Sequence, residues 1–346
     1  MRRDRAAEFT GLPALPALPE LPVLPGPGDD TVGLFARTLY GRTPTGGRLI
    51  GFVEPRPAET VLDGAAVRRR LVASIACPRG TLELDALLHL PAGATVTAPA
   101  PVVVALNFTG NADTIDGDQA DRWPYAQIAA AGFAVLTADY REIEPDHPEP
   151  APGTGVRVLF PETPADDDPA WGAIGAWAWG LSRLLDLAAL VDGVDAARAT
   201  ALGHSRLGKA ALWAAAQDER FAAVVSNDSG CAGASLFRHP GGEDIAAITR
   251  VFPHWLVSSF AAYAGRESEL PLDQHQLLAA VAPRRVLVLS ARDDLWADPI
   301  GEELAVFAAA PAFAPGAIEY HAREGGHDLT PADWCRALAF VSPKRE

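Results

Sequence analysis

The chain has 346 residues, with 44 acidic and 29 basic side chains and a formal net charge of −15. This acidic balance argues against nucleic-acid binding, which needs a basic face. The sequence contains no run of 18 apolar residues, so it predicts no membrane-spanning helix. The three cysteines, Cys77, Cys231 and Cys335, form neither a disulfide framework nor a metal-ligand spacing. We expect a monomer that acts on small molecules or neutral polymers, with no metal and no cofactor.

Residues 1–30 are predicted to form a proline-rich tail ahead of a single domain over residues 31–346. Prolines recur every third residue at Pro13, Pro16, Pro19, Pro22 and Pro25, a pattern typical of polyproline II. We expect this tail to be disordered or to lie along the domain surface. The basic residues 1–5 are not followed by the apolar segment of a secretion signal. As written, the sequence therefore predicts a cytoplasmic protein, unless its start has been processed.

From about residue 65 onward, strand-like and helix-like segments alternate. Residues 67–90 have the character of an antiparallel hairpin. Short apolar runs then predict strands at residues 102–108, 133–138, 199–203, 222–226, 285–290 and 317–321. Helical patterns cover residues 123–131, 173–191, 207–217 and 331–340. This alternation predicts an α/β protein, with a mostly parallel central sheet between two layers of helices.

Residues 199–209 carry the strongest chemical signal. They combine a strand, the pattern G-x-S-x-x-G around Ser205, and the start of a helix. An abrupt strand-to-helix turn between small residues exposes the nucleophile in the α/β-hydrolase fold, where the pattern is G-x-S-x-G. Here Leu207 takes the place of the second glycine, which comes one residue later as Gly208. By itself the pattern also fits a serine that caps a helix.

A serine nucleophile needs a general base, and the base needs an acid that fixes its tautomer. His327 follows the last predicted strand in a glycine-flanked loop, as the base of this fold should; the alternative is an incidental exposed histidine. Asp294 and Asp228 each end a predicted strand, and the later position favours Asp294. Either aspartate could instead be a turn residue bonded to its own backbone.

Several motifs in this order resemble the glucuronoyl esterases of carbohydrate esterase family 15. The strand-to-helix turn at the nucleophile, called the nucleophile elbow, reads Gly203-His-Ser-Arg-Leu-Gly-Lys209 here, where the family has G-C-S-R-x-G-K. Further similarity to the bacterial branch lies at Leu106-Asn-Phe-Thr-Gly-Asn111, Trp171-Gly-Ala-Ile-Gly-Ala-Trp-Ala-Trp-Gly180, Ser226-Asn-Asp-Ser-Gly-Cys231, Phe252-Pro-His-Trp255, Asp273-Gln-His275, Asp294-Leu-Trp-Ala-Asp-Pro299 and His327-Asp-Leu-Thr-Pro-Ala-Asp-Trp334. The resemblance therefore runs from about residue 106 to residue 334.

The resemblance implies hydrolysis of esters of 4-O-methyl-D-glucuronic acid, which join glucuronoxylan side chains to lignin alcohols. It assigns the nucleophile to Ser205, the base to His327 and an oxyanion stabiliser to Arg206. The family often has its acid where Asp228 stands, whereas some bacterial members use the position of Asp294. The substrate lies outside the cell, which implies an extracellular or periplasmic location and does not match the absence of a secretion signal.

The resemblance also assigns contacts with the uronic sugar to Lys209, Glu243 and Trp296. Lys209 lies four residues after Ser205, on the same helical face. From the residues alone, Lys209 could be a solvated lysine, Glu243 a surface acid and Trp296 a core residue. Arg206 beside the nucleophile could likewise be a surface arginine at the helix start.

Two departures from the family pattern stand out. His204 replaces the cysteine that fungal members use in a disulfide, and Asp228 is one methylene shorter than the usual glutamate. Three other functions stay open: an acetyl xylan or other acyl esterase of the same fold, a peptidase of the prolyl-oligopeptidase type, and a catalytically inactive binding protein on the hydrolase scaffold.

Overall fold

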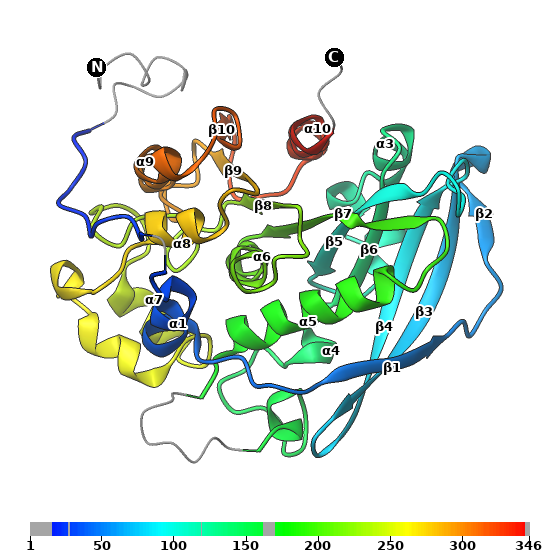
Figure 1. Cartoon of the computed structure of the whole chain (residues 1–346), viewed down its shortest axis with the longest axis horizontal. Coiled ribbons are helices and arrows are strands. Elements are labelled where there is room, and N and C mark those ends of the chain that lie inside the picture. The colour runs from blue at the N-terminus through cyan, green and yellow to red at the C-terminus, as the bar shows by residue number, and fades with distance from the viewer. Residues whose placement is uncertain (1–15, 27, 119, 162–169, 343–346) are drawn as a thin grey trace.

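The computed structural model describes residues 16–26, 28–118, 120–161 and 170–342 (Figure 1). The predictions for Pro13 and for residues 1–5 lie outside these residues. The strands are β1 (Arg48–Val53), β2 (Glu59–Val61), β3 (Ala66–Cys77), β4 (Gly80–Pro91), β5 (Ala100–Asn107), β6 (Ala134–Asp139), β7 (Val194–His204), β8 (Ala223–Asn227), β9 (Arg285–Ala291) and β10 (Ile318–Arg323).

The helices follow the same numbering in chain order. The α-helices are α1 (Thr31–Phe35), α2 (Asp113–Asp116), α3 (Tyr125–Ala130), α4 (Tyr140–Ile143), α5 (Ala173–Ala188), α6 (Arg206–Gln217), α7 (Ile245–Val251), α8 (Gln274–Ala280), α9 (Pro299–Ala309) and α10 (Pro331–Val341). Shorter helical turns are η2 (Ala36–Tyr40), η3 (Leu62–Gly64), η4 (Ala120–Arg122), η5 (Arg157–Leu159), η6 (Ser258–Tyr263), η7 (Glu267–Glu269) and η8 (Ala310–Ala312).

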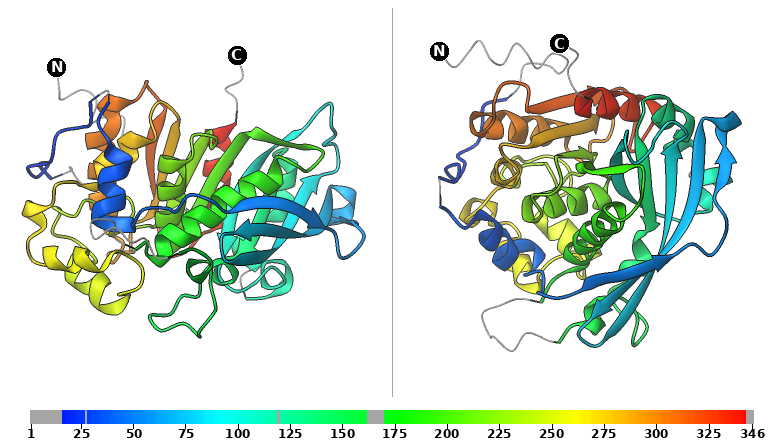
Figure 2. Two further views of the ribbon diagram at one scale, coloured as in Figure 1. Left: turned by 60° about the horizontal axis from the view of Figure 1, so that its bottom comes forward. Right: turned by 45° about the vertical axis from the view of Figure 1, so that its right-hand side comes forward.

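The ten strands of the described residues join one mixed sheet in the order β1-β3-β4-β6-β5-β7-β8-β9-β10, and β2 pairs with β3. Strands β6 to β10 and β5 are parallel, whereas β1 to β4 run antiparallel to their neighbours. In both views of Figure 2 the antiparallel strands lie at one end of the molecule, opposite the segment that contains α7 and η6. The predicted α/β-hydrolase fold is confirmed, including the hairpin of β3 and β4.

The parallel strands are buried on both faces, because their side chains alternate between two apolar clusters. In β5, Val102 and Val104 belong to the larger cluster, while Val103 and Ala105 belong to the smaller one. The larger cluster includes residues of α5, α6, α8 and α9, and the smaller one includes residues of α3 and α10. This arrangement gives the predicted layers of helix, sheet and helix.

Most predicted helix ends match the structure, and the differences have local causes. Helix α3 begins at Tyr125 rather than at Trp123, because Pro124 occupies the N-cap position. Helix α5 ends at Ala188, since the chain turns there toward β7 through Gly193, whose φ is +87°. Thr330 caps α10 in a capping box with Asp333, ahead of proline in the first helical turn.

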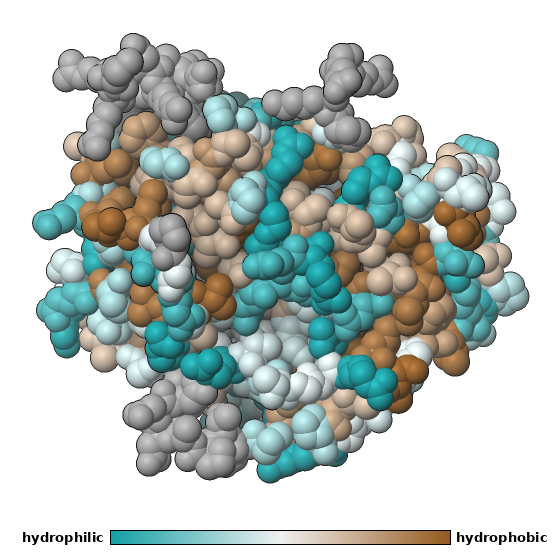
Figure 3. Space-filling model, in the orientation of Figure 1, coloured by the Kyte–Doolittle hydropathy of each residue, from teal (hydrophilic) through white to brown (hydrophobic). Residues whose placement is uncertain are grey.

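The described part of the proline-rich tail, residues 16–26, contains no helix or strand and lies against the surface. The side chains of His275 and Gln276 bond to the carbonyl oxygens of Pro22 and Val23, at 2.9 and 2.7 Å. The three cysteines are free, and no described helix is long and apolar enough to cross a membrane. A band of hydrophilic residues breaks up the apolar patches on the face in Figure 3.

Candidate active site

Four loops meet at one edge of the sheet, because they follow the four neighbouring parallel strands β7, β8, β9 and β10. These loops carry Ser205, Asp228, Asp294 and His327 respectively. The carboxyl ends of parallel strands share one edge, which is where ligands bind in open α/β sheets. The topology therefore brings together residues that are up to 122 positions apart, as the spacing of Ser205 and His327 shows.

Ser205 occupies a strained turn between β7 and α6. Its φ of 57° and ψ of −129° lie outside the regions that L-residues prefer. A Cβ at Gly203 would lie 2.0 Å from the Leu207 carbonyl oxygen, so only glycine fits there. At Gly208 a Cβ would lie 3.0 Å from the Ser229 Cβ and 3.1 Å from the Gly203 oxygen. The second glycine thus keeps the helix close to the strand ends although it comes one residue late.

A cavity of about 340 Å³ opens beside Ser205. All eight site residues predicted from the sequence line it: Ser205, Arg206, Lys209, Asp228, Glu243, Asp294, Trp296 and His327. The other lining residues are Ser229, Gly230, Phe252, Trp255 and Ala297. The structure therefore brings the predicted residues together in one place, while their roles stay predictions.

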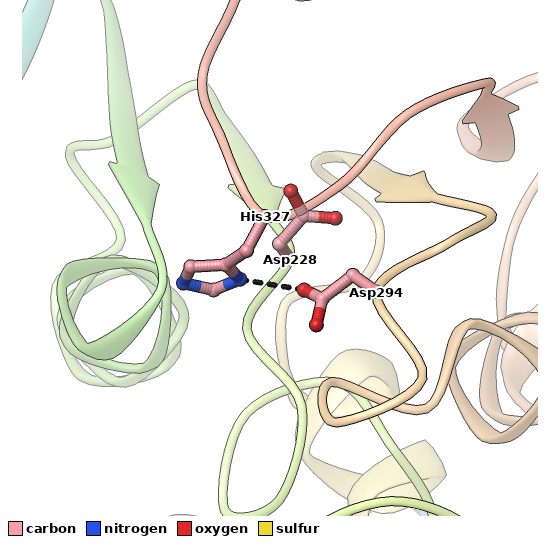
Figure 4. A group of neighbouring side chains, drawn as sticks. All are labelled: Asp228, Asp294 and His327. Carbon is pink, nitrogen blue, oxygen red and sulfur yellow. Dashed lines mark hydrogen bonds and ion pairs between the residues drawn. The ribbon is translucent and has the colours of Figure 1, made fainter.

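His327 is paired with Asp294 in this cavity. Its Nδ1 lies 2.5 Å from Asp294 Oδ2, and Figure 4 shows the imidazole ring turned toward this carboxylate. The side chain of His327 is 43% exposed, whereas that of Asp294 is only 5% exposed. With Nδ1 held by the carboxylate, Nε2 is the ring nitrogen available to a substrate or to a serine hydroxyl.

Asp228 lies close to His327, but its carboxyl group is hydrogen-bonded to the backbone. Its Oδ1 accepts a hydrogen bond of 2.6 Å from the Ala291 N–H, and the side chain is fully buried. Burial, together with the nearby carboxylates of Glu302 and Asp294, raises the pKa of Asp228 to about 8, although His327 opposes the shift. This raised pKa favours the neutral acid at Asp228, so Asp294 is the better source of negative charge next to His327.

His204 ends β7 and lies directly behind His327. The two ring centroids are 4.5 Å apart, and His204 Nδ1 lies 2.6 Å from the side-chain oxygen of Asn227. Burial, and then the charges of His327 and Arg122, keep the pKa of His204 well below its usual range. A neutral aromatic ring thus occupies the position where the fungal pattern has cysteine.

The turn after β8 is organised by Glu302 of α9, which is fully buried. Its carboxylate accepts hydrogen bonds from the backbone N–H groups of Ser229 and Gly230, both at 2.9 Å, and from the Ser290 hydroxyl. Burial raises the pKa of Glu302 to about 7. This carboxylate fixes the turn so that two of its carbonyl groups point toward Lys209.

Lys209 is buried in the floor of the cavity and is not a solvated lysine. Its ammonium donates to the carbonyl oxygens of Ser229 and Cys231, at 2.6 and 2.5 Å. It lies 3.9 Å from a carboxylate oxygen of Glu243. Because an ammonium has three donors, one is left for a ligand in the cavity.

Glu243 and Trp296 form the adjoining side of the cavity. The backbone N–H of Glu243 donates to the Trp296 carbonyl oxygen at 2.9 Å. Burial raises the pKa of Glu243, against the effect of Lys209. Trp296 is 59% exposed, so it is not a core residue, and Glu243 is buried rather than a surface acid.

Arg206 begins α6, and its guanidinium is held by an ion pair and by two aromatic rings. Its Nη1 donates to Asp146, and its guanidinium lies over the rings of Trp255 and Phe252, at 4.8 and 5.4 Å from their centroids. Its side chain is 27% exposed. Arg206 is therefore an anchored residue of the cavity rather than a surface arginine.

One group of side chains has the composition of a metal site. Ligand atoms of Asp228, Asp294 and His327 all lie within 4.8 Å of one another. However, the hydrogen bond between His327 and Asp294 already occupies the two atoms that would face each other across an ion. This bond favours an acid–base pair over a metal centre.

Two carboxylates that support the cavity from outside were not predicted from the sequence. Asp146 follows α4 and contacts Arg206, 60 positions away, and Glu302 binds the turn at Ser229, 73 positions away. Nothing local distinguishes these two carboxylates from surface acids. The motif Phe252-Pro-His-Trp255 did indicate this part of the cavity, because it belongs to the family resemblance. The guanidinium of Arg206 lies over two of its aromatic rings.

Comparison with known proteins gives a consistent result. The model of the family described as fungal glucuronyl esterases matches residues 74–314. A carbohydrate esterase from an unknown prokaryotic organism is 35% identical, covering 90% of this chain and 83% of that protein. A structure of a glucuronoyl esterase from Solibacter usitatus superposes with a TM-score of 0.82, at 32% identity, over 95% of this chain and 98% of that one.

One fungal relative aligns in sequence over a shorter stretch. A 4-O-methyl-glucuronoyl methylesterase from Phanerochaete chrysosporium is 32% identical over 167 residues, which is 45% of this chain and 35% of that protein.

Proposed function

Because this chain belongs to the glucuronoyl esterases of carbohydrate esterase family 15, which are carboxylic ester hydrolases, we propose that it cleaves esters of 4-O-methyl-D-glucuronic acid through an acyl-enzyme on Ser205. The observation that carries the proposal is the meeting of the Ser205 elbow with the His327–Asp294 pair in one cavity. The names of the fungal relatives support the sugar ester as the substrate.

In the first half of the reaction, Ser205 Oγ attacks the ester carbonyl carbon while His327 Nε2 takes the hydroxyl proton. Asp294 holds the other ring nitrogen and stabilises the imidazolium that forms. The tetrahedral oxyanion accepts a hydrogen bond from the backbone N–H of Arg206, at the positive end of α6. The guanidinium of Arg206 adds a fixed positive charge. Collapse then breaks the bond to the alcohol oxygen, which leaves with the proton from His327.

In the second half, His327 removes a proton from water, whose oxygen attacks the acyl carbon. The second tetrahedral intermediate collapses, Ser205 recovers its proton, and the free uronic acid leaves. At neutral pH this product is an anion. A chain with a net charge of −15 repels it weakly, whereas the neutral ester does not meet this repulsion.

The polar side of the cavity supports a sugar as the acyl group. The unused donor of Lys209 and the carboxylate of Glu243 can bond to vicinal hydroxyls, a pattern that a simple acetyl group lacks. The exposed ring of Trp296 offers an apolar face against which a pyranose can stack.

Hydrolysis of benzyl glucuronate, followed by the release of free uronic acid, tests the proposal. We expect turnover with the wild-type chain and none with Ser205→Ala. A panel with p-nitrophenyl acetate and acetylated xylan serves as the comparison. A higher kcat/KM on the acetyl esters would favour a general acyl esterase, and a folded protein with no turnover and no fluorophosphonate labelling would be an inactive binding protein.

A further inference from the structure

Asp146, in the segment after α4, has four hydrogen-bond donors around one carboxylate. Its Oδ1 accepts from His254 Nε2 at 2.8 Å and from Trp255 Nε1 at 2.7 Å. Its Oδ2 accepts from the Tyr140 hydroxyl at 2.9 Å and from Arg206 Nη1. The side chain is only 9% exposed, and Asp146 does not line the cavity. Such a carboxylate can act on a substrate only through the groups that it holds.

The charge of Asp146 is well supported despite its burial. Burial alone would favour the neutral acid, but the hydrogen bonds from His254 and Trp255 and the charge of Arg206 outweigh it, so the pKa of Asp146 lies far below its usual range. The partner of Arg206 is therefore an anion at every pH at which an esterase is assayed.

The same segment that supplies two of the donors also supplies a platform for the arginine. The rings of Phe252 and Trp255 stack at 3.7 Å with an angle of 3° between them. The guanidinium of Arg206 lies over both rings. Trp255 in turn packs edge-on against Trp177 of α5, with ring centroids 6.2 Å apart. An ion pair on one side and an aromatic face on another leave the guanidinium little freedom to rotate.

We propose that Asp146 is a positioning residue, which together with His254 and Trp255 fixes the guanidinium of Arg206 at the oxyanion side of the cavity. This inference rests on the proposed role of Arg206 in ester hydrolysis and deepens it. Within the described residues only Nη1 of the terminal nitrogens is hydrogen-bonded, so Nη2 stays available to charge that develops on the substrate. A preorganised donor of this kind needs no reorientation when the oxyanion forms.

A double-mutant cycle tests the proposal on p-nitrophenyl acetate, because an oxyanion forms with any ester. This choice separates the inference from the choice of natural substrate. We expect Arg206→Ala to lower kcat about 100-fold, as for loss of one oxyanion donor. Asp146→Asn, which keeps the size but loses the charge, should lower kcat about 10- to 100-fold through misplacement of Arg206, with little change in KM.

The combined variant decides the mechanism. If Asp146 acts through Arg206, then Arg206→Ala with Asp146→Asn should be no slower than Arg206→Ala alone. Losses that multiply would overturn the proposal, and so would an Asp146→Asn variant that keeps the wild-type kcat. Failure to hydrolyse benzyl glucuronate, with an intact cycle on p-nitrophenyl acetate, would contradict only the proposed substrate.

Glu144 provides a matched control in the same segment. Its carboxylate is 1% exposed and pairs with Arg157 at 2.8 Å, away from Arg206. We expect Glu144→Gln to lower the thermal midpoint but to leave kcat within about twofold of wild type, because no oxyanion donor is moved. If Asp146→Asn fails to fold, Trp255→Phe keeps the stacked ring and removes one donor to Asp146. An unchanged kcat in Trp255→Phe would then count against the proposal.

Discussion

Two sides of the cavity, here called walls, carry opposite kinds of charged group. The acid–base wall, made of His327, Asp294 and Asp228, gathers carboxyl groups around one imidazole, and the buried Glu302 adds a further acid. The cationic wall consists of Arg206 and Lys209, and each has a carboxylate nearby, Asp146 at Arg206 and Glu243 at Lys209.

The walls balance these charges by different means. On the acid–base wall a raised pKa at Asp228 removes one negative charge, so this wall contains groups that titrate in the neutral range. On the cationic wall Asp146 stays ionised, so the ion pair that holds Arg206 does not change with pH. This division suits a reaction in which one side moves protons and the other stabilises a fixed oxyanion.

Ser205 lies where the two walls meet, so its removal should have the largest effect. We expect Ser205→Ala to lower kcat by about 10⁴-fold or more, because neither wall has a nucleophile to act on. Steady-state hydrolysis of benzyl glucuronate measures the loss, and circular dichroism checks the fold. A variant with a tenth of wild-type activity would remove Ser205 from the mechanism.

The next effect separates the two aspartates of the acid–base wall. Asp294→Asn should lower kcat by about 10²- to 10⁴-fold, since an amide favours the wrong imidazole tautomer. Asp228→Asn should cost less than about tenfold, because a mostly protonated carboxyl contributes little charge to His327. Both variants are measured on one uronate ester.

The variant with the larger loss of kcat identifies the aspartate that orients His327. A larger loss at Asp228 would reverse the assignment. Comparable losses would mean that the two carboxyls share the task of orienting His327.

The acid–base wall was largely predictable from the sequence, whereas the supports of the cationic wall were not. Ser205, Asp228, Asp294 and His327 each follow a strand with a clear apolar pattern, so strand order alone brings them to one edge. Asp146 owes its place to the packing of an irregular segment against α6, which has no periodic signal.

The same contrast holds for the fold. The buried parallel strands and the hairpin were predicted, because their apolar runs are continuous or paired in the chain. Strand β1 was missed, since its residues are half-exposed and its burial depends on pairing with β3. The boundary at residue 30 and the monomeric state stay predictions.

A variant at Lys209 tests whether the cationic wall recognises the sugar. Lys209→Met keeps the apolar stem and removes the ammonium. A lost charged hydrogen bond costs about 1.5–3 kcal/mol, so kcat/KM for the uronate ester should fall about 10- to 100-fold. Activity on p-nitrophenyl acetate should stay within about threefold, because this substrate has no hydroxyls to bond.

The comparison of the two substrates is the control in this experiment. Equal losses on both esters would indicate that Lys209 mainly holds the turn of Ser229 and Cys231 in place. That result would weaken the sugar-ester proposal without affecting the role of Ser205.

The smallest effect concerns stability, and it tests whether Asp228 carries a proton in the folded protein. Its pKa rises from 3.8 to about 8 on folding, so between these values the folded protein holds a proton that the unfolded chain has lost. Wild-type stability should therefore be greatest below pH 4 with respect to this group and fall as the pH rises toward 8.

Asp228→Asn removes this titration and leaves the other carboxyls in place, so the free energy of unfolding of the two proteins should diverge with pH. Relative to the variant, the wild type should lose about 2–3 kcal/mol between pH 5 and pH 7. Urea denaturation at both pH values measures the difference. Parallel profiles would mean that Asp228 is ionised when folded, which would make it again a candidate for the anion beside His327.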